Sequence, residues 1–246
     1  MVFGLLATLA TAAESQPAAS QLGLHARLNF VADPVVPCPP GSPDSLICPV
    51  GTGEGAVPGL GTVESTSKEL HQSGPPCSTG YFKFLGHPES WVVANKGEID
   101  FVIAASECVG SGISTDAFTV TGGAGLYAGA SGSGTVTHTA SLSSDGKVHG
   151  YETWTGALTV PGLDFDTTAP VLTGAANKTV KAKKGARSAR VTFKVTAQDD
   201  KDGAVPATCV PQSGSRFRVG RTVVECSVTD SSANAASASF KITVRR

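Results

Sequence analysis

The chain has 246 residues, a formal net charge of −1, only 16% charged residues and 29 glycines. This length accommodates two ordinary domains, each with its own core. The scarcity of charge and the abundance of Gly, Thr, Ser and Ala argue against a helical protein and favour many short strands.

The small net charge hides two oppositely charged parts. Residues 1–165 contain 5 Lys and Arg against 14 Asp and Glu, whereas residues 166–246 contain 14 against 6. Two interpretations are open. The charges can serve solubility or the docking of the two parts on each other, or the C-terminal part can bind a polyanion. The basic residues are not interleaved with aromatic ones, so we expect no nucleic-acid partner.

The N-terminus has the features of a secretion signal. Residues 2–10 form a short apolar run, and Ala10-Thr11-Ala12 supplies the small residues of a signal-peptidase site. We expect a signal peptide over residues 1–12, a flexible lead-in over 13–23 and a secreted, extracellular protein. The run is too short to span a bilayer and no later run reaches that length, so no membrane span is expected.

Six cysteines fit an oxidising compartment. Proximity in the sequence favours the pairs Cys38–Cys48, Cys77–Cys108 and Cys209–Cys226, although six cysteines allow fifteen connectivities. Zinc is the competing interpretation, but no Cys-x-x-Cys occurs and no His lies at ligand spacing from a Cys. We therefore expect neither a metal nor a cofactor.

A first domain is predicted over residues 24–160. It opens on an alternating strand, with Leu24, Ala26, Leu28 and Phe30 on one face. Residues 34–58 are rich in Pro and Gly and are predicted to form a long loop. Further strands are predicted at 59–69, 79–86, 90–94, 98–106, 116–121, 132–142 and 148–160. Such an antiparallel meander of about eight strands usually closes into a barrel, because closure removes exposed edges.

The glycine-rich segment from Phe118 to Val136 reads FTVTGGAGLYAGASGSGTV. It resembles a stretch of the allene oxide cyclase and dirigent-like barrels, which implies an eight-stranded, calycin-like fold. From the residues alone, Gly122, Gly123 and Gly125 permit a tight reversal, and the later glycines permit close strand approach. A phosphate-binding loop is excluded because no Gly-Lys-Ser/Thr follows and a strand comes next.

The hairpin 134–158 supports an argument about register. If Ser144-Asp145-Gly146 is a three-residue loop with Gly146 left-handed, Val136 pairs with Trp154 and His138 with Glu152. Apolar residues then share one face, which a one-residue slip would scramble. His138, Glu152 and Trp154 thus become candidate pocket residues. The pair is interpreted either as a hydrogen-bonded polar pair inside the barrel or as an acid/base or ligand-orienting pair.

After a linker at residues 161–169, a second domain is predicted over 170–246. Its features are Asp166-Thr-Thr-Ala-Pro170, two cysteines flanking Ser-Gly-Ser and Phe217-x-Val219-Gly220, and Asp230 four residues after Cys226. This combination resembles the hyalin repeat (HYR) family. The resemblance implies an immunoglobulin-like β-sandwich, an extracellular setting and a Cys209–Cys226 disulfide between neighbouring strands.

Two other sequence patterns give weaker evidence of function. No Gly-x-Ser-x-Gly occurs, so no nucleophile elbow supports a serine hydrolase. Asp199, Asp200 and Asp202 with Gly203 suggest a calcium loop, but the bidentate acid of an EF-hand is missing, which favours a solvated turn.

The sequence therefore predicts an all-β protein: an eight-stranded antiparallel calycin-like barrel followed by an immunoglobulin-like sandwich. We expect a secreted, non-enzymatic binding or adhesion protein whose HYR domain contacts an extracellular protein or surface polymer, with residues 166–246 as a hypothetical polyanion-binding part. One alternative makes the barrel an apolar-ligand carrier or a cyclase or isomerase that uses His138 and Glu152. Another is a structural envelope component. A filled barrel interior favours adhesion or structure, whereas a cavity of several hundred Å³ favours the carrier or enzyme.

Overall fold

The computed structural model describes residues 20–246, apart from residues 34, 35, 37, 43–45, 73–82, 96 and 109–112. The predicted signal peptide and Cys77, one partner of the predicted Cys77–Cys108 pair, lie outside the described residues. The described residues form strands, turns and loops, with no helix. None of their segments is therefore a helix long and apolar enough to cross a membrane.

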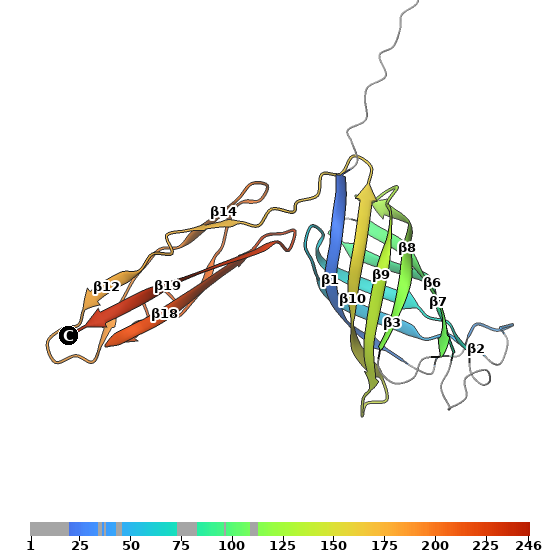
Figure 1. The fold of residues 1–246 in the computed structure, drawn as a ribbon, viewed down its shortest axis with the longest axis horizontal. Coiled ribbons are helices and arrows are strands. Elements are labelled where there is room, and N and C mark those ends of the chain that lie inside the picture. Colours follow the sequence, from blue (N-terminus) through green and yellow to red (C-terminus); the bar gives the residue numbers. More distant parts are fainter. Residues whose placement is uncertain are drawn as a thin grey trace, which may run out of the picture.

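The N-terminal strands form a closed antiparallel barrel, as predicted (Figure 1). Around the barrel β1 pairs with β10, then β9, β8, β7, β6, β4 and β3, and β3 returns to β1. Two short strands, β2 (Leu46–Ile47) and β5 (His71–Gln72), extend the sheet beside β6. The eight barrel strands are β1 (Ser20–Ala32), β3 (Val50–Val57), β4 (Gly61–Lys68), β6 (Lys83–Ala94), β7 (Gly97–Cys108), β8 (Ile113–Gly125), β9 (Ser131–Leu142) and β10 (Val148–Val160).

The prediction of a loop over residues 34–58 is wrong for its last part, which is strand β3. Glycines alternate along this strand, and a Cβ at Gly53 would lie 2.5 Å from the Ser65 hydroxyl and 2.9 Å from the Asn29 carbonyl oxygen. Glycine by itself is a poor strand former, which is why the sequence predicts a loop here. Here it allows β1 and β4 to approach β3 closely on both sides.

Two other boundaries differ from the predictions. The described part of the strand expected at 79–86 and the strand expected at 90–94 belong to one strand, β6. Its pairing with β7 shifts register between Phe84 and Gly86 and again between His87 and Ser90. Such irregularities interrupt the regular alternation of side chains between the two faces of the strand. Strand β1 begins at Ser20, within the predicted lead-in, because Leu22 is buried and pairs with Leu158.

The barrel interior is filled by alternate residues of its strands. Of the four residues predicted to share one face of β1, Leu24, Ala26 and Leu28 are buried and Phe30 is partly buried. Three aromatic rings meet at its centre, since Trp154 lies 4.9 Å from both Phe101 and Phe118, centroid to centroid. Edge-to-face and tilted packing of this kind adds to the stability from burial.

The glycine-rich segment is partly as predicted. Strand β8 runs through Gly122 and Gly123 to Gly125, so the reversal comes later, at residues 126–129, with Gly125 and Gly129 at positive φ. Close approach is confirmed at Gly134, where a Cβ would lie 2.2 Å from the carbonyl oxygen of Thr155 on the neighbouring strand.

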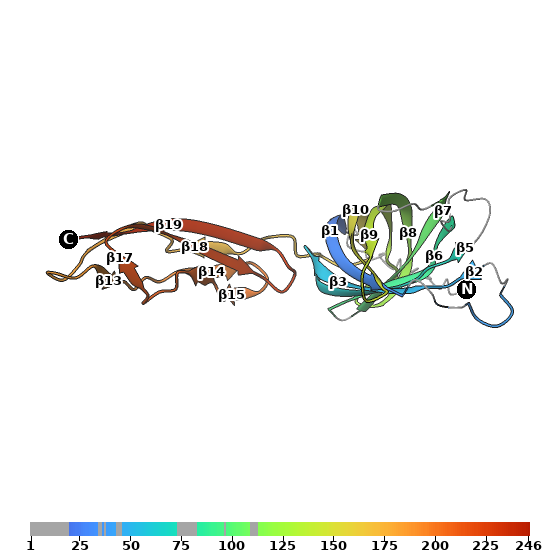
Figure 2. The same cartoon turned by 90° about the horizontal axis from the view of Figure 1, so that it is seen from below.

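The C-terminal part is an elongated domain of short strands beside the barrel (Figures 1 and 2). Its sheets are β11-β14-β15, β12-β19-β18-β16 and β13-β17, and Val224, Phe240 and Ile242 lie in the core between them. Cys209 and Cys226 face each other on β16 and β18 and form a disulfide. The strands are β11 (Val171–Thr173), β12 (Lys178–Lys181), β13 (Ser188–Arg190), β14 (Thr196–Asp199), β15 (Gly203–Val205), β16 (Thr208–Val210), β17 (Arg216–Arg218), β18 (Gly220–Thr229) and β19 (Ala235–Arg245).

The segment between the two domains is packed. Phe165 is buried in the barrel core and Leu163 packs against it. The loop after β18 also reaches the barrel, because the Gly59 N–H donates a 2.7 Å hydrogen bond to the Ser232 carbonyl. Residues 161–169, predicted as a simple linker, therefore form part of the barrel's apolar packing.

Candidate functional site

The predicted register of the β9–β10 hairpin is confirmed. Val136 pairs with Trp154 and His138 with Glu152, and Gly146 in the connecting loop has a φ of +80°. Glu152 is 6% exposed and faces inward. The Nδ1 of His138 lies 3.4 Å from Glu152 Oε1. The turn with Gly146 at positive φ thus sets a strand register that places an imidazole and a carboxylate together inside the barrel.

Other strands add polar groups to this pair. The indole N–H of Trp154 donates a 3.0 Å hydrogen bond to Glu152 Oε2. On β8, Asp116 Oδ2 lies 3.8 Å from His138 Nε2 and accepts a hydrogen bond from the Ser114 hydroxyl. On β6, the His87 ring lies 5.6 Å from the His138 ring, centroid to centroid. We call His87, Asp116, His138, Glu152 and Trp154 the barrel polar cluster.

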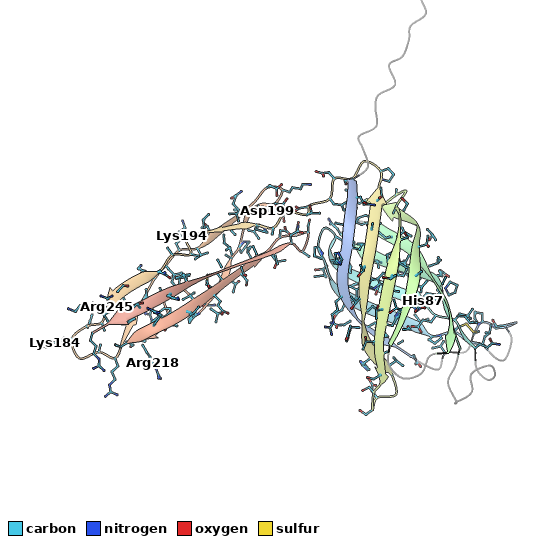
Figure 3. All side chains as sticks on the ribbon, viewed as in Figure 1. His87, Lys184, Lys194, Asp199, Arg218 and Arg245 are labelled. Atoms are coloured by element: carbon cyan, nitrogen blue, oxygen red, sulfur yellow. A yellow bond between two sulfur atoms is a disulfide. The ribbon has the colours of Figure 1, made fainter. Side chains whose placement is uncertain are left out.

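Sequence reasoning found three members of this cluster and missed Asp116 and His87. The sequence does contain a signal for Asp116, because it alternates with Phe118 and Val120 along one predicted strand. The structure shows all three side chains buried. No comparable signal existed for His87, labelled in Figure 3, because the register shifts of β6 change the face on which its residues lie.

The electrostatics of the cluster favour a charged imidazole. Burial acts to lower the pKa of His138, but the neighbouring carboxylates outweigh it and raise the pKa above the usual 6.5. These carboxylates are Glu152, which also accepts a hydrogen bond, then Asp116 and Glu69. A protonated His138 would donate from both ring nitrogens and reduce the repulsion among the acids.

The interior cavity beside the cluster is small. It has a volume of about 60 Å³ and apolar walls, to which Trp154 contributes but His138 and Glu152 do not. Pockets for metabolites and drug-sized ligands occupy roughly 300–1,000 Å³. The side chains of His138 and Glu152 therefore do not face this small apolar cavity.

A second candidate site lies on the C-terminal domain, at the end away from the barrel. Strand pairing brings together three segments, residues 181–190, 216–221 and 244–246, because Lys181 pairs with Arg245 and Ser188 with Arg218. Figure 3 shows Lys184, Arg218 and Arg245 at this end and Asp199 at the other. We call the set the basic end: Lys181, Lys183, Lys184, Arg187, Arg190, Arg216, Arg218, Arg221, Arg245 and Arg246.

Charge is strongly segregated along this domain. The three segments of the basic end contain no Asp or Glu. Every side chain of the basic end is exposed. The aspartates of the domain instead occupy positions 166, 199, 200, 202 and 230. Asp199 lies at the end towards the barrel (Figure 3), and carboxylate oxygens of Asp166 and Asp230 lie within 4.8 Å of it. An exposed, single-sign surface of this density creates a field that attracts anions.

The predicted disulfides within the described residues have the expected partners, since Cys38 joins Cys48 and Cys209 joins Cys226. Residues 165–244 match the family model of the HYR domain, which confirms the resemblance for the C-terminal part. No curated protein and no solved structure matches the chain. The resemblance of the barrel to the allene oxide cyclase and dirigent-like families stays a prediction.

Proposed function

We propose that this chain is a secreted binding protein whose HYR domain attaches to an anionic extracellular polysaccharide through the basic end. The HYR match indicates an extracellular, adhesion-type module. The observation that carries the proposal is the concentration of exposed Lys and Arg on three converging segments with no acidic residue among them.

The architecture supports presentation of this surface. The facing sheets of the C-terminal domain enclose an apolar core, and we infer from them and from the HYR match an immunoglobulin-like sandwich. Lys184, Arg218 and Arg245 lie at the end of the domain farthest from the barrel (Figure 3). Loops at one end of a rigid sandwich are a common place for binding residues. The acidic barrel, with a surplus of nine negative charges in residues 1–165, would stay away from a polyanion.

For the barrel we propose a structural role. Its cavity of about 60 Å³ is far smaller than a carrier or enzyme pocket, and the His138–Glu152 pair is engaged with Trp154 and Asp116. Polar contacts of this kind between neighbouring strands favour one packing of the interior. The barrel then serves as a rigid base that holds the HYR domain.

Heparin serves as the test polyanion, with uncharged dextran as the negative control. The full chain should bind heparin with an affinity that falls steeply as salt rises, because neutralised anions release their counterions. A triple variant, Lys184→Gln, Arg187→Gln and Arg218→Gln, should reduce the slope of log affinity against log salt by roughly 2.

The matched control removes the same charge elsewhere on the same domain, through Lys178→Gln, Lys194→Gln and Lys241→Gln, all at exposed positions. This control should bind heparin nearly as wild type does. Equal losses in the two triple variants would mean that net charge alone drives binding and would reject the basic end as a site. Absence of heparin binding at low salt would reject the proposal.

A further inference from the structure

Three buried aspartates converge at the end of the HYR domain nearest the barrel. Asp166 precedes β11, Asp199 ends β14 and Asp230 follows β18, and these residues are 7%, 4% and 8% exposed. One carboxylate oxygen from each lies within 4.8 Å of the other two. Three carboxylates this close and this buried repel one another strongly unless a cation or protons join them.

Only some of the carboxylate oxygens of these three aspartates accept hydrogen bonds. Asp230 accepts from the main-chain and side-chain nitrogens of Asn234. Asp199 Oδ1 accepts from the N–H groups of Lys201 and Asp202, which leaves its Oδ2 to be explained.

The remaining oxygens point to a ligand. Asp166 Oδ1 accepts from the Thr168 N–H. Within the described residues, Asp199 Oδ2 is buried and has no hydrogen-bond partner; Asp166 Oδ2 is also buried and accepts no hydrogen bond of normal geometry, although the Ser232 side chain lies close to the Asp166 carboxylate. A buried carboxylate oxygen without a donor costs several kcal/mol in general, so two in one cluster need a positively charged occupant or a proton.

The nearby lysine does not fill this role. Lys201 Nζ donates to Asp164 Oδ2 at 2.8 Å and to the carbonyl oxygens of Asp164 and Phe165. It therefore lies beside the cluster and offsets part of its charge, but its hydrogen bonds go to other oxygens.

We propose that Asp166, Asp199 and Asp230 bind a calcium ion. All three supply hard oxygen donors, which suit Ca²⁺ and Mg²⁺ and not thiolate-seeking metals. Calcium–oxygen distances of about 2.3–2.6 Å place two ligands of one ion up to about 5 Å apart, so oxygens within 4.8 Å of one another can share it. Magnesium requires a tighter, near-octahedral shell and gives up its water reluctantly, which makes calcium the better fit.

The position of the site gives the ion a mechanical role. The Asn234 side chain, which donates to Asp230, also donates to the carbonyl oxygen of Asp166. The same loop contacts the barrel, through the hydrogen bond from Gly59 to Ser232. An ion that ties Asp230 to Asp166 and Asp199 would thus hold this loop and stiffen the junction between the two domains. This inference is independent of the basic end and of what it binds.

The test uses the full chain, freed of divalent ions with a chelator and studied by isothermal titration and scanning calorimetry. Calcium should bind with a stoichiometry of one and raise the unfolding temperature of the HYR domain by about 6 °C or more at ten times the dissociation constant. Asp199→Asn should abolish both effects, because it removes the charge of one ligand. The variant keeps the oxygen that accepts hydrogen bonds from the N–H groups of Lys201 and Asp202, so the local turn should stay intact. Without calcium, this variant should be at least as stable as wild type, because repulsion is relieved.

Asp200→Asn is the matched control, since Asp200 is the adjacent, exposed aspartate. It should keep calcium binding within about twofold of wild type. The proposal is rejected if millimolar calcium gives neither heat nor a stability shift, or if Asp199→Asn responds as wild type does. A domain that loses stability as pH rises from 5 to 7.5, with no response to calcium, would show instead that the carboxylates share protons.

Small-angle scattering should show a narrower range of interdomain distances with calcium in the wild type and no change in Asp199→Asn.

Discussion

Replacing Glu152 by leucine should destabilise the barrel by about 2–4 kcal/mol. Glu152 accepts the indole N–H of Trp154 at 3.0 Å and lies 3.4 Å from His138 Nδ1. Leucine has a similar size but no acceptor, so two donors lose their partner. A buried donor without a partner costs about 1–3 kcal/mol. The cost at His138 is the smaller, because its side chain is 13% exposed and water can reach it.

Tryptophan fluorescence during urea unfolding measures this effect on the barrel alone. Both tryptophans, Trp91 and Trp154, are in the barrel, and residues 161–246 contain neither Trp nor Tyr. Glu152→Gln is the control, because its amide oxygen still accepts one hydrogen bond and should limit the loss to about 1 kcal/mol. If the free energies of unfolding of both variants lie within about 0.5 kcal/mol of the wild-type value, the barrel polar cluster does not stabilise the barrel and the prediction is wrong. Loss of a bound small molecule at unchanged stability would instead support the carrier or enzyme.

Three further predictions concern stability. His138, which faces Glu152, Asp116 and Glu69, contributes stability that is fully present below pH 6.5 and is lost as pH rises through its raised pKa; the urea midpoint of the barrel should fall between pH 6 and 8, and fall less in Glu152→Gln. Gly134→Ala should cost about 2 kcal/mol or more, because its Cβ meets a backbone oxygen at 2.2 Å, whereas Gly23→Ala, with nothing within 4 Å, should change the urea midpoint little; equal effects would refute the close approach. Converting Cys209 and Cys226 to serine should lower the calorimetric stability of the HYR domain by about 3 kcal/mol, since the bond closes a separation of 17 residues, and an unchanged transition would contradict this.

The sequence alone determined the features that depend on neighbouring residues. The register of β9 and β10 follows from alternation and from a three-residue turn ending in Gly146, and it correctly placed His138 opposite Glu152. The HYR resemblance rests on cysteine and turn spacing within one segment, and the family model matches residues 165–244. Such signals are local, because turn geometry and a period of two residues act over a few positions.

Only the tertiary structure decided what depends on distant segments. Strand β3 looked like loop because the reason for its glycines, close contact with β1 and β4, lies on other strands. Asp199 and its neighbours were interpreted as a solvated turn, since nothing near them in the chain completes a calcium loop. Folding brings Asp166 and Asp230 to Asp199 from 33 and 31 residues away. Which side chains meet across such separations is set by how strands pair and pack, a choice that no short stretch of the sequence encodes.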